Sequence, residues 1–188
     1  MRKPVKYVLI ACAIGLIVFG ACNFRHTVHR AGRHLYAGKG VPENKELALL
    51  CFHLSSFLGH EESPWYLARN YALGHTVEQD HDKAVEWCLV GAHRNHAPTQ
   101  YQLARYYGCD TLEHLYNEQL AFEWMYRSAV QGYAEAQYML YLYYLDGTGV
   151  EPDTTLAYEW LKASARQGNE YAQRAYLRST TDSLNTKQ

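Results

Sequence analysis

Arginines recur in this sequence at a nearly constant spacing, and their side chains could bind anions. Arg33, Arg69 and Arg105 lie 36 residues apart, and Leu142 occupies the next position in phase. A guanidinium group can donate two parallel hydrogen bonds to one carboxylate. Because like charges in a row repel one another, we expect a negative group among them. That acid could belong to a partner or to this chain, and the arginines could also be only solvated.

Two neighbouring sets of residues recur with the same phase. One consists of His34, Asn70, Tyr106 and Tyr143, and the other of Arg30, Tyr66, Gln102 and Met139. Both sets end on apolar or aromatic side chains, which suits a peptide or protein partner with acidic groups and an apolar anchor. The predicted partner-binding residues are Arg33, Arg69, Arg105, Asn70, Tyr106, Tyr143 and Met139.

The ten histidines raise the question of a metal site. The pairs His26/His29 and His93/His96 have the spacing that places two side chains on one face of a helix. Neither pair has a nearby third ligand in the sequence, and zinc sites use at least three protein ligands. We therefore expect no metal and no other cofactor.

Motifs of known enzymes are missing from the sequence as well. It contains no P-loop, no nucleophile elbow and no His-Glu-x-x-His motif. Glu86, Glu123 and Glu159 each precede a tryptophan in phase with the repeat, which indicates a structural or solvated face. We expect a protein without enzymatic activity. The alternative from the enzyme class is an envelope hydrolase, which would require a convergent acid–base pair.

A second repeated pattern indicates the elements that would position these residues. An alanine precedes a tryptophan by three residues, and a small residue follows it by five, in Ala84-Trp87-Ala92, Ala121-Trp124-Ala129 and Ala157-Trp160-Ala165. Residues that can cap a helix stand in phase at Asn44, Asp80, Asn117 and Asp153. The period of 36 or 37 residues predicts stacked helical hairpins. We call the first helix of each pair helix A and the second helix B.

Packing within the hairpins follows from the same pattern. The pairs Leu67/Tyr71, Leu103/Tyr107 and Leu140/Tyr144 are four residues apart and share the face of helix A that should be buried. The small alanines Ala48, Ala84, Ala121 and Ala157 should lie where helices approach closely. We expect the tryptophans of helix B to pack against a neighbouring helix A.

The pattern resembles the Sel1-like repeat, a relative of the tetratricopeptide repeat. The fourth unit matches the family pattern best, through Ala136, Gly147, Gly149, Val150, Asp153, Ala157, Trp160, Ala165 and Gly168. The chain departs from the pattern at Ala68, Ala104 and Tyr141, which replace a family glycine. The resemblance implies an all-α, right-handed solenoid of stacked antiparallel helix pairs that binds other proteins, usually on the concave face lined by helix A.

The repeats set the expected domain organisation. Residues 26–178 should form the solenoid, with units at about 26–61, 62–97, 98–134 and 135–171 and then a capping helix. The first unit is degenerate and should act as the N-terminal cap. The polar residues 179–188 are predicted to form a disordered tail.

The first 22 residues have the layout of an export signal. Three basic residues, Arg2, Lys3 and Lys6, precede the uncharged, mostly apolar run Tyr7–Cys22. The end of this run, Phe19-Gly20-Ala21-Cys22, resembles a bacterial lipobox, which would make Cys22 the lipidated residue. An uncleaved anchor helix and a soluble exported protein are the alternatives. All three place the remainder outside the cytoplasm, and Asn23 after the cysteine favours the outer membrane.

Three further cysteines, Cys51, Cys88 and Cys109, lie in the repeats without the spacing of a zinc site. Cys51 and Cys88 fall in equivalent helices of adjacent units, so they are the favoured pair if a disulfide forms. Free, buried thiols are the simpler alternative.

The charge balance limits the class of partner. Three of the 18 basic residues lie in the first 21 positions, so the remainder carries 15 basic against 19 acidic residues. This balance argues against nucleic acid. We expect a protein-interaction scaffold or adaptor, tethered at the bacterial cell envelope with its body in the periplasm. A second possibility within binding proteins is an immunity lipoprotein that neutralises a toxin or effector in the periplasm.

Overall fold

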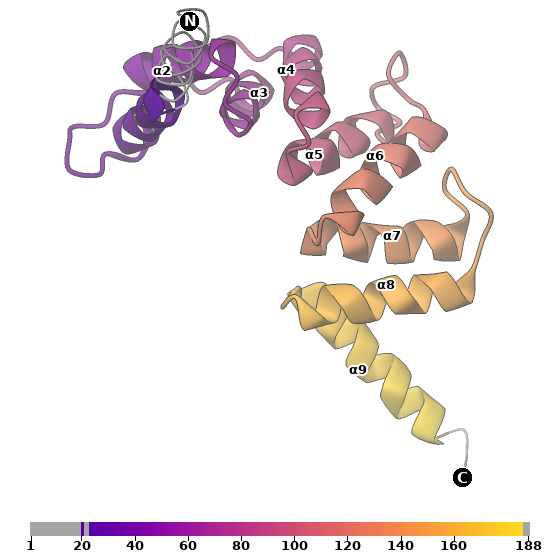
Figure 1. Ribbon diagram of the computed structural model, residues 1–188. Helices are drawn as coiled ribbons and strands as arrows, with labels where there is room; N and C mark the ends of the chain where they lie inside the picture. Colours follow the sequence, from indigo (N-terminus) through magenta and orange to yellow (C-terminus); the bar gives the residue numbers. More distant parts are fainter. Residues whose placement is uncertain (1–19, 21–22, 186–188) are drawn as a thin grey trace, which may run out of the picture. The chain divides into compact units, whose positions relative to one another are not determined.

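The computed structural model describes residue 20 and residues 23–185, with side chains described through residue 180. The first helix, which we call the N-terminal helix, covers residues 23–37. The others are α2 (Lys45–Phe57), α3 (Ser63–Leu73), α4 (His81–His93), α5 (Ala97–Tyr107), α6 (Glu118–Val130), α7 (Ala134–Asp146), α8 (Thr154–Arg166) and α9 (Glu170–Asn185) (Figure 1). Strands are missing from this part of the chain.

The chain forms two compact units, one ending at Trp87 and the other beginning at Cys88. The predicted signal or anchor, including Cys22, lies outside the described residues. Among the helices that are described, none combines the length and the apolar character needed to cross a bilayer.

Each helix B begins at the residue predicted to cap it. The side chains of Asn44, Asp80, Asn117 and Asp153 accept hydrogen bonds from backbone amides two or three residues further on, at 2.8 to 2.9 Å. These amides would otherwise have no partner in the first turn of the helix. The four predicted helix starts are confirmed.

The alanines and leucines predicted for the core are buried, whereas Tyr71 and Tyr107, predicted on the same face, are half-buried. The four alanines of helix B, Ala48, Ala84, Ala121 and Ala157, and the three leucines of helix A, Leu67, Leu103 and Leu140, are all 0% exposed. In the first unit, Phe52 joins this core and lies against Gly32 of the N-terminal helix. A Cβ atom on Gly32 would come within 2.9 Å of the Phe52 ring, so only glycine permits this approach.

Polar side chains tie the helix pairs of the second unit at matching positions. The amides of Gln100, Gln137 and Gln173 donate to the carbonyls of Ala92, Ala129 and Ala165 at 3.1, 3.1 and 3.2 Å, each eight residues earlier. Pro64 occupies the equivalent position in the first unit. Because proline has no side-chain donor, the junction between α2 and α3 lacks this glutamine tie.

The tryptophans make ring contacts that were not predicted from the sequence, although Trp87 also packs against the core cluster that includes Leu67 of helix A. Trp87 lies against His53 of α2, Trp124 against His93 of α4, and Trp160 against Tyr126 of α6, with ring centroids 5.2, 5.5 and 6.0 Å apart. Each of these ring contacts joins a helix B to the preceding helix B, whereas the sequence suggested packing on helix A. The partner of Trp87 and the partner of Trp160 each stand two positions beyond the phase of the tryptophan, and the partner of Trp124 stands six positions beyond it, so the repeat alone did not identify them.

The end of the chain is also more ordered than predicted. Helix α9 continues to Asn185, so the expectation of a disordered tail from Ser179 is wrong over these residues, and 186–188 lie outside the described part. Serine and threonine are poor helix formers, but here Ser179 and Thr180 donate to the carbonyls of Tyr176 and Leu177. These local bonds satisfy the hydroxyl groups within the helix.

The cysteines of the repeats are free thiols. Cys88 is fully buried, and burial raises the pKa of its thiol to about 12. Burial also raises the pKa of Cys51, which is half-buried. At neutral pH the buried Cys88 therefore acts as a small apolar group, whereas Cys51 remains partly accessible.

Trp124 provides a test of this packing, because it is only 8% exposed while Trp160 is half-buried. Changing Trp124 to alanine should lower the free energy of unfolding by about 3–5 kcal/mol, through lost burial and the cavity that remains. The measurement is denaturant unfolding followed by circular dichroism. Trp160→Ala is the matched control and should cost less. Equal losses for the two variants would contradict the assigned difference in burial.

Candidate partner-binding site

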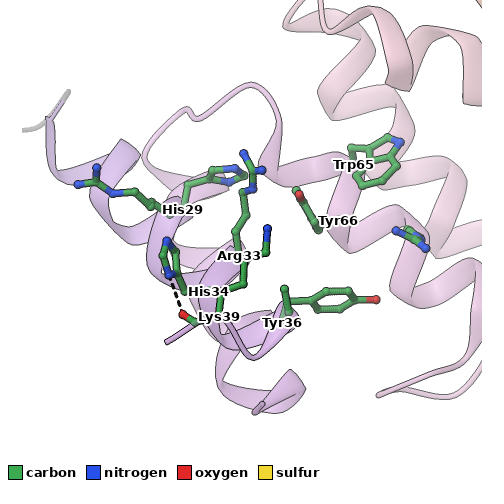
Figure 2. A pocket seen from close by; sticks show the side chains of 10 residues that line it. His29, Arg33, His34, Tyr36, Lys39, Trp65 and Tyr66 are labelled. Atoms are coloured by element: carbon green, nitrogen blue, oxygen red, sulfur yellow. Dashed lines mark hydrogen bonds between the residues drawn. The ribbon is translucent and has the colours of Figure 1, made fainter. Parts of the chain in front are cut away.

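A cavity of about 500 Å³ lies between the N-terminal helix and α3. Its walls are formed by His29, Arg30, Arg33, His34, Tyr36, Ala37, Lys39, Trp65, Tyr66 and Arg69. Arg33 and Tyr36 come from the N-terminal helix, and Trp65 and Tyr66 face them from α3 (Figure 2). The structure thus brings together two of the three arginines predicted from the sequence.

The cavity wall is strongly cationic. Arg30, Arg33, Arg69 and Lys39 are exposed, and the ten lining residues include no aspartate or glutamate. Within the part of the chain that is described, no carboxylate forms an ion pair with Arg33 or Arg69. Their positive charge is therefore available to an acid from outside the chain.

Aromatic rings hold the cavity in shape. Tyr66 stacks on the buried Phe52 with ring centroids 4.3 Å apart. The centroids of the Tyr36 and Trp65 rings lie 6.0 and 4.9 Å from the centroid of the Tyr66 ring. The Arg69 guanidinium lies over the Trp65 ring, 5.4 Å from its centroid. Such a contact restrains the arginine while leaving its hydrogen-bond donors exposed.

The phenol of Tyr66 is placed between opposing charges. Burial is the main cause that raises its pKa, and the carboxylate of Glu62 raises it further. The guanidinium groups of Arg33 and Arg69 act in the opposite direction because they favour the phenolate. Both guanidinium groups therefore favour negative charge at the Tyr66 phenol.

Arg105 lies in the second unit with an aromatic partner of its own. Its guanidinium is 5.8 Å from the centroid of the Tyr101 ring, which repeats the arrangement of Arg69 over Trp65. In both cases the aromatic residue stands four positions before the arginine. Sequence analysis missed these aromatic partners, although Trp65, Tyr101 and Tyr138 recur with the same phase as the arginines.

Three of the predicted partner-binding residues are buried, which corrects the expectation that they line an open surface. Asn70 is 1% exposed, Tyr106 7% and Tyr143 8%. The Asn70 amide donates to the Tyr66 carbonyl, and its oxygen accepts from the Thr76 hydroxyl, so this side chain supports the loop after α3. Burial raises the pKa of Tyr106 to about 12. The repeat phase correctly predicted that these residues lie on helix A. In the structure they face the core and not the surface.

Met139, the last predicted residue, lines a separate cavity of about 470 Å³ in the second unit. Its neighbours there include Tyr101, Tyr138, Tyr171 and Glu135. This cavity combines aromatic rings with carboxylates, so it differs in charge from the cavity that contains Arg33.

Comparison with known proteins accounts for this architecture. The Sel1 repeat model matches residues 28–60, 65–96, 97–133 and 134–169. The chain belongs to the Sel1 repeat family. The predicted all-α solenoid of helix pairs is confirmed, and Sel1 repeat proteins generally act as scaffolds for protein–protein interaction. No curated protein gives a significant match.

Two solved structures share the fold. The Sel1 repeat protein from Oxalobacter formigenes is 34% identical, with a TM-score of 0.63, and the match covers 69% of this chain and 97% of that one. The antigen c5321, a protective antigen present in uropathogenic Escherichia coli strains, displays an SLR fold and is 24% identical with a TM-score of 0.75. The match covers 84% of this chain but 34% of the antigen, so this chain spans about a third of its length.

One polar cluster of this Sel1 repeat protein has the residue types of a hydrolase triad. The His29 ring nitrogen Nδ1 lies 2.8 Å from the Ser63 hydroxyl, and Nε2 lies 3.1 Å from a Glu62 carboxylate oxygen. The contact between Nε2 and Glu62 is short but is not a hydrogen bond, so Nε2 is left without a hydrogen-bond partner. Ser63 is 0% exposed and its hydroxyl is shared with Ser55 at 2.7 Å. Through these bonds the cluster joins the first two helix pairs of the Sel1 array.

His60 lies beside this cluster and is sensitive to its charge. Its ring stacks on His29 with centroids 3.9 Å apart, and its Nδ1 accepts from the Glu62 amide. Burial and the neighbouring His29 lower the pKa of His60 to about 4, against an opposing effect of Glu61. Folding therefore favours the neutral ring.

The pKa of His60 predicts how stability depends on pH. As the pH falls from about 6.5 toward 4, the unfolded chain gains a proton at His60 that the folded chain resists. Stability should fall across this window, and His60→Gln should reduce the slope. The measurement is the Tm at steps from pH 7.5 to 4.5, with His75→Gln as the control at an exposed loop histidine. A slope unchanged by His60→Gln would contradict the assignment.

Proposed function

We propose that this Sel1 repeat protein is a non-enzymatic scaffold that binds an acidic segment of a partner protein in the cavity between the N-terminal helix and α3. The observation that supports the proposal is a wall of four cationic side chains without a lining carboxylate. A free cluster of this kind is electrostatically unfavourable, and an acid from a partner would relieve the repulsion. The aromatic rings beneath it provide an apolar contact for the same segment.

The chemistry of the cavity favours a carboxylate-rich peptide over a single small anion. Arg33 and Arg69 lie on facing helices, and Arg30 and Lys39 extend the positive surface along the N-terminal helix. A segment with two or more acidic residues could satisfy several of these groups together. The Trp65 and Tyr36 rings would accept an apolar side chain beside them, which matches the acidic groups and apolar anchor inferred from the sequence.

The location of the scaffold is part of the proposal. The basic start, the apolar run and the small residues before Cys22 support export and tethering through a lipid or an uncleaved helix. A periplasm-facing protein at the bacterial cell envelope would then present the cavity to other envelope proteins. Tethering raises the effective concentration for partners in the same membrane, so modest affinity at the cavity suffices.

Charge reversal in the cavity should weaken partner binding. Cross-linked partners are first captured from the membrane fraction that contains the tagged full chain and are identified by mass spectrometry. The variant Arg33→Glu/Arg69→Glu should recover at least tenfold less of the main partner, because two attractive contacts become repulsive. Higher salt should also reduce capture by the wild type.

The matched control reverses two exposed arginines outside the cavity, as Arg166→Glu/Arg178→Glu. The control should retain the partner, and all three proteins should have the same Tm, because the four arginines are exposed. Equal recovery by the two variants would overturn the assignment of the cavity. The same spectra show whether the mature chain begins at an acylated Cys22.

A further inference from the structure

Helix α2 is apolar on two separate faces. One face, with Ala48, Leu49 and Phe52, is buried against the rest of the first unit. A second face exposes the four side chains Leu47, Leu50, Leu54 and Phe57, at 45%, 65%, 45% and 87%. We call these four residues the α2 stripe. An apolar helix face of this size in water indicates that another surface covers it.

The other units show that the repeat does not require this stripe. At the position equivalent to Leu50, the later helices B carry Glu86, Glu123 and Glu159, and all three are exposed. At the position of Phe57 they carry His93, Val130 and Arg166. All three later units thus carry a glutamate where α2 carries Leu50, although Val130 and Leu156 keep an apolar residue at the positions of Phe57 and Leu47. Among the four helices B, α2 alone carries large apolar residues at all four positions of the stripe.

The spacing of the stripe indicates what covers it. Its residues follow one another by three, four and three positions, which is the heptad spacing of the apolar seam in a coiled coil. If a second α2 pairs with it in the antiparallel direction about a two-fold axis, Leu47 lies opposite Phe57 of the other copy and Leu50 opposite its Leu54. Every apolar side chain of the stripe then meets another.

Charge favours the same arrangement. An antiparallel pair places Glu46 opposite Leu58 of the second copy, whereas a parallel pair would set the two Glu46 carboxylates against each other. A lipid surface fits less well, because membrane-surface helices carry basic residues beside the apolar face. Along α2 the basic residue Lys45 is already paired with Glu43 at 3.1 Å, and Glu46 is exposed.

We propose that the α2 stripe is a homodimer interface, in which α2 of two copies packs antiparallel about a two-fold axis. The interface is independent of the arginine-lined cavity, which lies between the N-terminal helix and α3. Four side chains form a small contact compared with the roughly 800 Å² per partner of a standard interface, so the dimer should depend on concentration.

The half-buried Cys51 offers a direct test, because it stands beside the stripe close to the proposed axis. The full chain is treated with a short bis-maleimide in the intact cells that produce it. We expect a covalent dimer that requires Cys51, shown by its loss in Cys51→Ser. Leu50→Glu should reduce the dimer at least tenfold, and the Tm should not change, because glutamate is the residue that the other units carry there.

The control is Leu156→Glu, which changes a leucine at the position of α8 equivalent to Leu47, with 43% exposure against 45%. It should leave the dimer intact. A second variant, Leu50→Glu combined with Leu54→Lys, should restore cross-linking, because positions 50 and 54 of opposite copies would carry opposite charges. Recovery of the dimer in this double variant also shows that the single change did not act by unfolding the chain.

Three results would overturn the proposal. The first is a Cys51 cross-link that Leu50→Glu leaves unchanged. The second is cross-linking of Cys51 to Cys12 or Cys22 within one chain, which would show that the N-terminal segment covers the stripe. The third is a monomer in which Leu50→Glu lowers only the fraction bound to lipid vesicles containing one-third phosphatidylglycerol, which would assign the stripe to the membrane.

Discussion

The structure depends on one close approach that recurs in every unit: a fully buried alanine of helix B, four residues after the capping asparagine or aspartate. At this position a larger side chain would push the helices apart, and the cap fixes where along the chain the contact occurs. Because cap and alanine stay in register, each helix A presents the same face to the core. The outward residues are then free to differ, and the cavity arginines and the α2 stripe use that freedom.

The fold could be predicted from the sequence because its determinants are local and periodic. Asn44, Asp80, Asn117 and Asp153 each cap a helix within three residues, and Leu67, Leu103 and Leu140 repeat the phase of the core. The partners of the tryptophans were not predicted, because the contact with the preceding helix B depends on how helices lie beside one another. The last helix is longer than predicted, and the hydroxyl groups of Ser179 and Thr180 form hydrogen bonds within it.

The candidate site could be predicted only in part. The phase placed Arg33 and Arg69 on facing helices, and the structure joins them at one cavity. The phase alone did not distinguish an outward residue from an inward residue one position later. The buried Asn70, next to the exposed Arg69, was therefore wrongly predicted to be at the surface. Trp65 lies in helix A, outside the alanine–tryptophan pattern of helix B, so that pattern did not identify it. An aromatic residue four positions before an arginine was the local pattern that would have revealed it.

The glutamine ties have a consequence for how the array loses structure. Gln100, Gln137 and Gln173 link each helix A to the preceding helix B, and Pro64 interrupts this series at the first junction. In a stacked array, cooperativity is transmitted through contacts between neighbours. At the first junction the Ser63 hydroxyl, which contacts Ser55 and His29, takes the place of the glutamine tie. The backbone amides around this hydroxyl-linked junction should therefore exchange with deuterium as a group of their own, distinct from those around the glutamine-linked junctions.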